Sequence, residues 1–245
     1  MLVVIFDLDD TLSESKLPID KEISSLLTAL MSRYVVVILS GCKYEQFEAQ
    51  VIPYLEPMAK NENLILFPVN ATQLYRLSPE PVKVYEIKLD DVLKAKIAAA
   101  LKVASMGIDV PWGDSYGEII EDRGSQITFS ALGQEAPLEL KSQWDANCKK
   151  RLIMQKRLLR LLPECDITVG GKTSIDINAK GQDKSYAICR LEDMGYKKSD
   201  MLFVGDALFE GGNDYPIKQA GVVCIEVKGH EDTKRVIAKI LGDKL

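Results

Sequence analysis

The segment VVIFDLDDTL, residues 3–12, decides the fold. Its first four residues are apolar and typical of a buried strand, and two carboxylates, Asp7 and Asp9, follow directly. A carboxylate in this position can attack a phosphate ester and become an aspartyl phosphate. In an extended chain residues i and i+2 point to the same side, so we expect Asp9 to act beside Asp7 as acid and base. The alternative is a turn that starts with solvated acids.

Two later segments supply groups that suit a phosphate. The apolar residues 34–39 end at Ser40 and Gly41, whose hydroxyl and N–H groups could bind phosphate oxygens ahead of a helix. The segment GQDK, residues 181–184, opens another helix and offers Lys184 as a cation to offset the phosphate charge. Each segment alone also fits an ordinary turn or a solvated helix start, so only the combination indicates a site.

In a third segment an apolar strand is again followed by a carboxylate. Residues 201–204 lead into Asp206, and the glycine turn at residues 211–212 leads to Asp214 at the start of a helix. Hard oxygen ligands beside a phosphate suit Mg²⁺. The sequence therefore predicts an Mg²⁺ site made by Asp7, the backbone carbonyl of Asp9, Asp206 and Asp214.

The composition is that of an ordinary enzyme. The chain has 245 residues, of which 47% are hydrophobic and 27% charged, with a net charge of −5, so it can bury a core and form two domains. It has no basic stripe, which argues against a nucleic-acid partner. It also has no apolar run of ~18 residues and no N-terminal signal pattern. We expect a cytoplasmic protein with no membrane contact.

The order of elements predicts a core interrupted by an insertion. Apolar strands alternate with helices in residues 1–79 and 179–245, which predicts an α/β fold with a doubly wound parallel sheet and a site at the strand C-termini. Residues 80–178 instead resemble an α+β unit, with alternating antiparallel strands that have one solvated face. We expect the two parts to meet at hinges near Pro79 and at residues 179–181. The predicted elements are helices near 20–30, from about 43, and near 90–103 and 149–162, and strands at 3–6, 34–39, 64–67, 117–123, 126–132, 173–178, 201–204 and 222–227.

The motifs resemble a known superfamily. Asp7-x-Asp9-x-Thr11, Ser40, Lys184 and the pair Asp206 and Asp214 follow the order of the four motifs of the haloacid dehalogenase superfamily, which the chain resembles along nearly its whole length. It is most similar to the phosphomannomutase-like branch with a type IIB cap, whose last motif reads GDxxxxGGND, as in residues 205–214. The resemblance implies a Rossmann-like core with an inserted cap, an aspartyl phosphate on Asp7, Mg²⁺, and a phosphorylated small molecule as substrate.

The resemblance also implies substrate contacts in the cap and shows where the chain departs from the branch. Arg123 matches a cap arginine that contacts the sugar phosphate, Ser174 and Asp176 match a sugar-contacting Ser-x-Asp, and Lys16 falls where the branch has an arginine. The second and third cap arginines of the branch correspond to Gln134 and, nearby, Leu138. Both positive charges are missing at these positions.

These departures set the expected function. A mutase must hold a bisphosphate, which favours several cations, so the sequence favours a phosphatase that acts on a small sugar phosphate. The alternative is a phosphomannomutase that interconverts mannose 6-phosphate and mannose 1-phosphate. A second alternative is a catalytically silent protein that binds sugar phosphates. A strand edge of the cap could also pair with a second copy of the chain.

Overall fold

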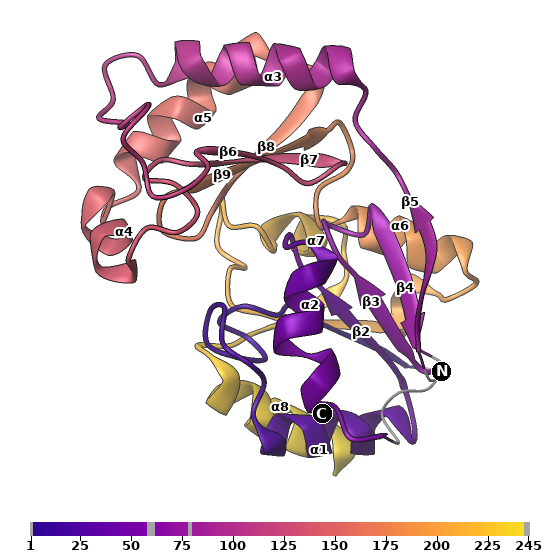
Figure 1. Ribbon diagram of the computed structural model, residues 1–245. Helices are drawn as coiled ribbons and strands as arrows, with labels where there is room; N and C mark the ends of the chain where they lie inside the picture. Colours follow the sequence, from indigo (N-terminus) through magenta and orange to yellow (C-terminus); the bar gives the residue numbers. More distant parts are fainter. Residues whose placement is uncertain (1, 58–61, 78–79, 243–245) are drawn as a thin grey trace. The chain divides into compact units, whose positions relative to one another are not determined.

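The computed structural model describes residues 2–57, 62–77 and 80–242, and the chain divides into two compact units (Figure 1). Unit 1 contains residues 1–86, 184–210 and 214–245, and unit 2 contains residues 87–183 and 211–213. The division follows Glu86, whereas the sequence placed the boundary at residues 79 and 80. The predicted hinge at Pro79 lies outside the described residues.

A seven-stranded sheet forms the middle of unit 1, with the order β11-β10-β1-β2-β3-β4-β5. The five strands from β11 to β3 are parallel, as predicted, and the apolar runs of β1, β2, β3 and β10 are buried on both faces. At one edge β4 and β5 join the sheet as antiparallel strands, and neither strand was predicted from the sequence. The strands are β1 (Val3–Phe6), β2 (Val35–Leu39), β3 (Leu64–Phe67), β4 (Gln73–Leu77), β5 (Pro81–Glu86), β10 (Met201–Gly205) and β11 (Val223–Glu226).

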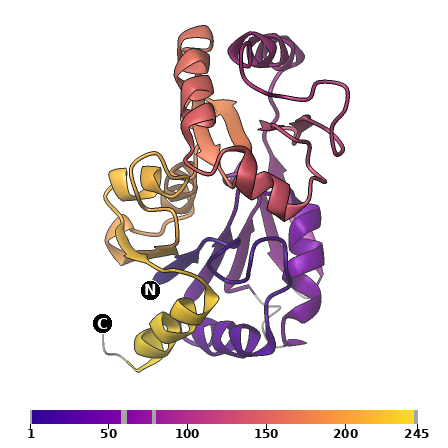
Figure 2. The same cartoon turned by 90° about the vertical axis from the view of Figure 1, so that its left-hand side faces the viewer.

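Helices cover both faces of this sheet. One face packs against α1 (Lys21–Met31), α2 (Tyr44–Gln50) and α8 (His230–Leu241), and the other against α6 (Tyr186–Asp193) and α7 (Tyr215–Gln219). Helices α1 and α8 lie side by side in both views (Figures 1 and 2). The predicted cap of α1 is confirmed, because Asp20 Oδ1 accepts a hydrogen bond of 2.8 Å from the Ile23 N–H. The described part of the unit also contains the 3₁₀ helices η1 (Ile52–Tyr54) and η3 (Lys198–Asp200).

Unit 2 is the α+β insertion that the sequence predicts. Its four-stranded antiparallel sheet has the order β6-β7-β9-β8, and its apolar face forms a separate core with α3 and α5. β8 and α4 were not predicted from the sequence. The elements are α3 (Asp91–Ala104), β6 (Ile120–Asp122), β7 (Gln126–Ser130), α4 (Leu138–Trp144), α5 (Lys149–Leu161), β8 (Cys165–Gly170) and β9 (Ser174–Ala179).

The prediction of a solvated face is wrong for β7. Gln126, Thr128 and Ser130 alternate with apolar residues, yet all three are buried. They bind other polar groups: Gln126 Nε2 donates to Thr128 Oγ1 at 2.8 Å, and Thr128 donates to Asp176 of β9 at 2.7 Å. A polar face satisfied by its own hydrogen bonds can be buried without a large penalty. Among the described residues no helix is both long and apolar enough to cross a membrane.

Candidate active site

Asp7 follows β1 and lies at the centre of a buried charged group in unit 1. Its N–H donates to the Val204 carbonyl of β10 at 3.0 Å, which continues the parallel ladder and fixes the backbone. Its carboxylate Oδ1 lies 2.5 Å from the Nζ of Lys184, and the same Nζ lies 2.6 Å from Asp214 Oδ1. All three side chains are at most 5% exposed. One ammonium therefore bridges two carboxylates that are far apart in the sequence.

The backbone places Asp214 with little freedom. Asp214 stands at the start of α7, and its Oδ2 accepts a hydrogen bond of 3.0 Å from the Ala207 N–H. It also lies directly against Gly205, the last residue of β10, where a Cβ would overlap with Asp214 Oδ2. Gly205 is therefore needed because no other residue leaves room for this carboxylate.

The charges in this group shift one another's titration. Burial alone would lower the pKa of Lys184, but the carboxylates of Asp214 and Asp7 outweigh it and raise that pKa above its ordinary value. Burial raises the pKa of the Asp7 carboxyl, and the Lys184 ammonium opposes that rise. Burial and the charge of Asp214 raise the pKa of Asp206 to about 6. Three acids thus share a single buried ammonium, which leaves an excess of negative charge.

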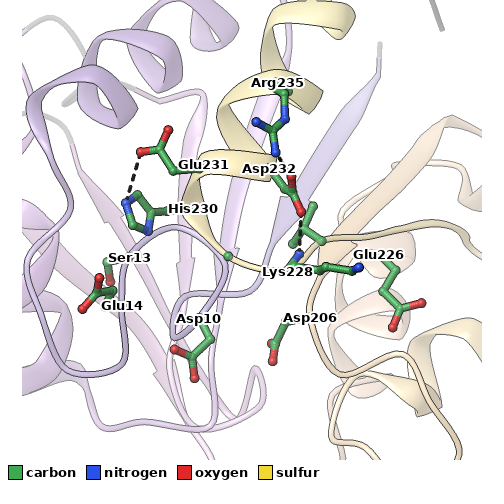
Figure 3. A pocket seen from close by; sticks show the side chains of 12 residues that line it. Asp10, Ser13, Glu14, Asp206, Glu226, Lys228, His230, Glu231, Asp232 and Arg235 are labelled. Carbon is green, nitrogen blue, oxygen red and sulfur yellow. Dashed lines mark hydrogen bonds and ion pairs between the residues drawn. The ribbon is translucent and has the colours of Figure 1, made fainter.

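That excess suits a divalent cation. Oxygens of Asp7, Asp206 and Asp214 all lie within 4.8 Å of one another, and carboxylates are ligands that Mg²⁺ accepts. Asp206 also borders a cavity of about 620 Å³ at the ends of β10 and β11, together with Asp10, Glu226 and the first turn of α8 (Figure 3). Asp7 and Asp214 are buried while Asp206 is partly exposed, so the group opens to solvent at Asp206. The residues present therefore fit the predicted ion.

Asp9 does not join that group of side chains. The chain leaves the strand after Phe6 and turns, with the Leu12 N–H donating to the Leu8 carbonyl at 2.9 Å, so the rule for an extended chain does not hold at Asp9. Its carboxylate accepts hydrogen bonds from the Lys16 N–H at 2.8 Å and from Gln46 Nε2 of α2 at 3.0 and 3.2 Å. Asp9 thus has its own set of partners, which differs from that of Asp7.

Ser40 lies at the end of β2, next to β1 in the sheet, and is buried. Its Oγ accepts the Cys42 N–H at 3.2 Å. A turn after β3 supports this loop: the Asn70 N–H donates to the Ser40 carbonyl at 2.9 Å, and the Val69 N–H donates to the Cys42 carbonyl at 2.9 Å. Residues 69–71 all have positive φ angles, an unfavourable backbone for non-glycine residues that the surrounding contacts must hold.

The other predicted substrate contacts divide between the two units, with Lys16 in unit 1 and the rest in unit 2. Lys16 contacts Asp9 through its backbone N–H, and its side chain is exposed. Arg123, Ser174 and Asp176 belong to unit 2. Ser174 and Asp176 lie on the polar side of β9, opposite Ser130 and Thr128 of β7. Arg123 forms an ion pair of 2.8 Å with Glu121.

The structure supplies a cation that the sequence analysis missed at Gln134. Lys141 of α4 extends its Nζ to the Gln134 carbonyl oxygen at 2.8 Å. Leu138, where the sequence placed the other missing charge, is exposed on the first turn of the same helix. A positive charge is therefore present beside Gln134 even though the residue itself is neutral. The sequence did not indicate this contact, because whether Lys141 reaches Gln134 depends on where α4 begins.

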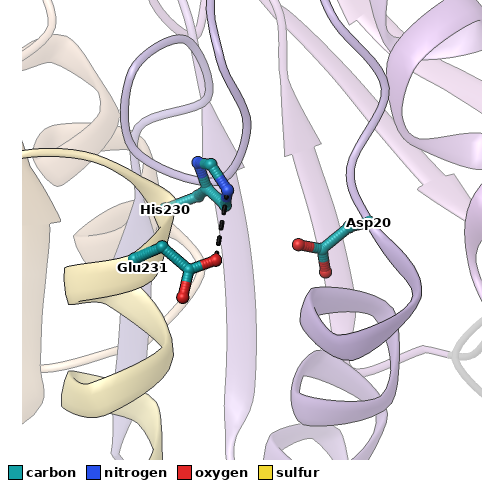
Figure 4. A group of neighbouring side chains, drawn as sticks. All are labelled: Asp20, His230 and Glu231. Carbon is teal, nitrogen blue, oxygen red and sulfur yellow. Dashed lines mark ion pairs between the residues drawn. The ribbon is translucent and has the colours of Figure 1, made fainter.

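A second group of potential metal ligands, Asp20, His230 and Glu231, lies at the ends of α1 and α8 (Figure 4). The Lys234 ammonium is 2.7 Å from Asp20 and 2.6 Å from Glu231. Lys234 thus joins the two helices through these ion pairs, and the three residues of the group are partly or fully exposed, so we assign this group to the packing of the two helices.

Comparison with known proteins identifies the family. The family model for eukaryotic phosphomannomutase matches residues 23–243. The chain belongs to this family. It is 26% identical over 247 residues to a phosphomannomutase of Saccharomyces cerevisiae, covering 98% of this chain and 94% of that protein. It is 27% identical over 252 residues to a phosphomannomutase of Encephalitozoon cuniculi, covering 98% and 93% of the two chains. It is therefore a haloacid dehalogenase superfamily enzyme.

Solved structures show the same fold at low identity. A haloacid dehalogenase-like hydrolase from Bacteroides thetaiotaomicron matches with a TM-score of 0.62 and 14% identity, covering 98% of this chain and 99% of that one. An IMP-bound IMP-nucleotidase from Plasmodium falciparum matches with a TM-score of 0.73 and 13% identity, covering 99% of this chain and 68% of that one. The predicted fold class, a doubly wound α/β core with an inserted α+β unit, is confirmed.

Proposed function

We propose that this member of the phosphomannomutase family transfers phosphoryl groups on hexose phosphates through an aspartyl phosphate at Asp7, and that it interconverts hexose 6-phosphate and hexose 1-phosphate. The observation that carries the proposal is the family match over residues 23–243 together with the bridge from Asp7 through Lys184 to Asp214. This assignment replaces the sequence-based preference for a phosphatase, since the relatives are mutases by name.

In this proposal the chemistry takes place in unit 1. Asp7 attacks phosphorus, and the bond to the sugar oxygen breaks as that oxygen takes a proton from Asp9. Lys184 and Ser40 bind the phosphate oxygens and offset the developing charge. Asp7, Asp206 and Asp214 would hold Mg²⁺, which when bound would supply Lewis-acid stabilisation of that charge. Asp9 then removes the proton from the hydroxyl that accepts the phosphoryl group from Asp7.

The identity of that acceptor separates a mutase from a phosphatase. When a sugar hydroxyl accepts the phosphoryl group the enzyme is a mutase, and when water accepts it the enzyme is a phosphatase. A neutral Gln134 favours the phosphatase, because a bisphosphate needs cations. The Lys141 ammonium lies 2.8 Å from the Gln134 backbone carbonyl oxygen. This positive charge beside Gln134 weakens the argument for a phosphatase.

The test is a ³¹P NMR time course with Mg²⁺ and mannose or glucose phosphates, with and without a hexose bisphosphate. We expect the 1-phosphate and 6-phosphate signals to interconvert, faster when the bisphosphate is present because it phosphorylates the enzyme. Growth of free phosphate without isomer exchange would replace the proposal with a phosphatase. Binding of the sugar phosphate with no change in either signal would indicate a silent binding protein.

We further propose that unit 2 selects the substrate through Arg123, Ser174 and Asp176. Replacing Arg123 with Gln should raise KM for the hexose phosphate about tenfold, since a guanidinium contact to an anion is lost. The kcat/KM for p-nitrophenyl phosphate, which has no sugar, should stay within twofold of wild type. A matched control is Arg160→Gln on α5. An unchanged KM for the hexose phosphate would refute the role of Arg123.

A further inference from the structure

We propose that Gln46 is the residue that positions Asp9 for proton transfer, and that Gln50 in turn fixes Gln46. The inference deepens the proposed function and rests on it. The observation is a chain of hydrogen bonds on the inner side of α2. Gln46 Nε2 lies 3.0 Å from Asp9 Oδ2 and 2.6 Å from Gln50 Oε1, and Gln50 Nε2 lies 2.8 Å from the Leu17 carbonyl oxygen.

The orientation of both amides is fixed by their end partners. A carboxylate and a backbone carbonyl can only accept hydrogen bonds. Gln46 must therefore turn its NH₂ group toward Asp9, and Gln50 must turn its NH₂ group toward Leu17. That leaves Gln50 Oε1 facing the second N–H of Gln46. Both donors of the Gln46 amide are used, one on Asp9 and one on Gln50, so the amide has one consistent orientation.

The chain of bonds is anchored to rigid structure. Gln46 and Gln50 stand four residues apart on α2, so they lie on the same face of the helix. Gln50 is 2% exposed, and its carbonyl accepts the Ile19 N–H at 2.9 Å. The segment that follows the Asp9 turn is thus joined to the end of α2 by two hydrogen bonds. Rotation of the Gln46 side chain would break its bond to Gln50 as well as its bond to Asp9.

The hydrogen bonds to the Asp9 carboxylate fit a role in proton transfer better than a role in substrate binding. The Gln46 amide approaches both carboxylate oxygens of Asp9, and the Lys16 N–H holds Oδ1 from another side. The amide is neutral and adds no net charge next to the reacting phosphate. A general acid must lie within about 2.6–3.2 Å of the atom it protonates. Fixing the Asp9 side chain therefore affects the rate of the step more than the affinity for substrate.

The test compares two leaving groups. A sugar alkoxide must be protonated as it leaves, whereas p-nitrophenolate leaves without a proton. We replace Gln46 with Met, which has similar length, favours helix and cannot donate a hydrogen bond. With the hexose phosphate that the wild type turns over fastest, kcat should fall about tenfold with KM within twofold. With p-nitrophenyl phosphate, kcat/KM should stay within twofold.

Two further variants make the result specific. Gln46→Asn keeps the amide on a shorter side chain that cannot reach Asp9. It should therefore also lower kcat for the hexose phosphate and leave kcat/KM for p-nitrophenyl phosphate within twofold. Gln155→Met is the matched control, since Gln155 Nε2 makes one hydrogen bond of 2.8 Å, to the Ile167 carbonyl in unit 2. It should leave both substrates within twofold of wild type. Thermal unfolding of each variant confirms that the folded protein is being assayed.

The outcomes separate this inference from the function on which it rests. A wild type that turns over neither substrate overturns the proposed function and this inference with it. With an active wild type, an unchanged kcat for hexose phosphate in Gln46→Met overturns the inference alone. An equal loss on both substrates also overturns it, because that result means Gln46 supports the site in general and not proton transfer by Asp9.

Discussion

Replacing Asp7 with Asn should lower turnover at least about 10⁴-fold, because the amide cannot form the phosphoenzyme. The fold should survive. Asn has the same shape, and Lys184 keeps its contact of 2.6 Å with Asp214. The measurement is the initial rate with hexose phosphate and Mg²⁺, alongside the thermal unfolding of both proteins.

A nearby acid offers the control for this substitution. Asp10 is exposed and has a φ angle of 59°, a backbone that Asn tolerates. Asp10→Asn should keep activity within threefold of wild type. Activity of Asp7→Asn within tenfold of wild type would mean that another residue is the nucleophile.

Replacing Lys184 with Met should cause the largest loss of stability. The variant leaves the buried carboxylates of Asp7 and Asp214 without their shared ammonium, and breaking a buried ion pair in this way costs about 3–5 kcal/mol. For a chain of this size that corresponds to a fall in Tm of roughly 10 °C. The measurement is thermal unfolding without divalent ions. Turnover should also fall sharply, because the charge that offsets the phosphate is gone.

Added Mg²⁺ should recover part of that stability. The ion would bind only the folded variant and so stabilise it, and the gain in Tm should be larger in Lys184→Met than in wild type, whose ammonium already offsets the carboxylates. Lys180→Met is the matched control: its side chain is 69% exposed and pairs with Asp166 at 3.1 Å, so it should cost less than about 1 kcal/mol. Equal Tm changes for the two lysines would contradict the role given to Lys184.

Much of the core was predictable because its signals are local. A strand in a parallel sheet is buried on both faces and reads as one apolar run, as in residues 35–39 and 201–204. Such strands end at the same edge of the sheet, which is why Asp7 and Asp206 could be expected together. Asp20, as an N-cap residue, predicted the start of α1.

The remaining elements depend on tertiary contacts. β5 contains Lys83 and Glu86, and β8 begins with Cys165-Asp166, so neither has a clean apolar pattern. Their pairing with β4 and β9 determines them. The direction of the Asp9 side chain could not be predicted either, since it depends on the turn after β1. The spacing of Gln46 and Gln50 indicates that they share one face of a helix. It does not indicate that they contact Asp9 and Leu17, because that depends on which loop α2 packs against.

Asp7 carries the phosphoryl group in the proposed mechanism, and this role is tested by locating that group on the protein. The enzyme is mixed with ³²P-labelled hexose phosphate and Mg²⁺, quenched in acid within milliseconds, and digested for peptide mapping. We expect label on the peptide that contains Asp7, stable in acid and lost in alkali, and absent from Asp7→Asn. Label on another residue, or turnover without any labelled protein, would contradict it.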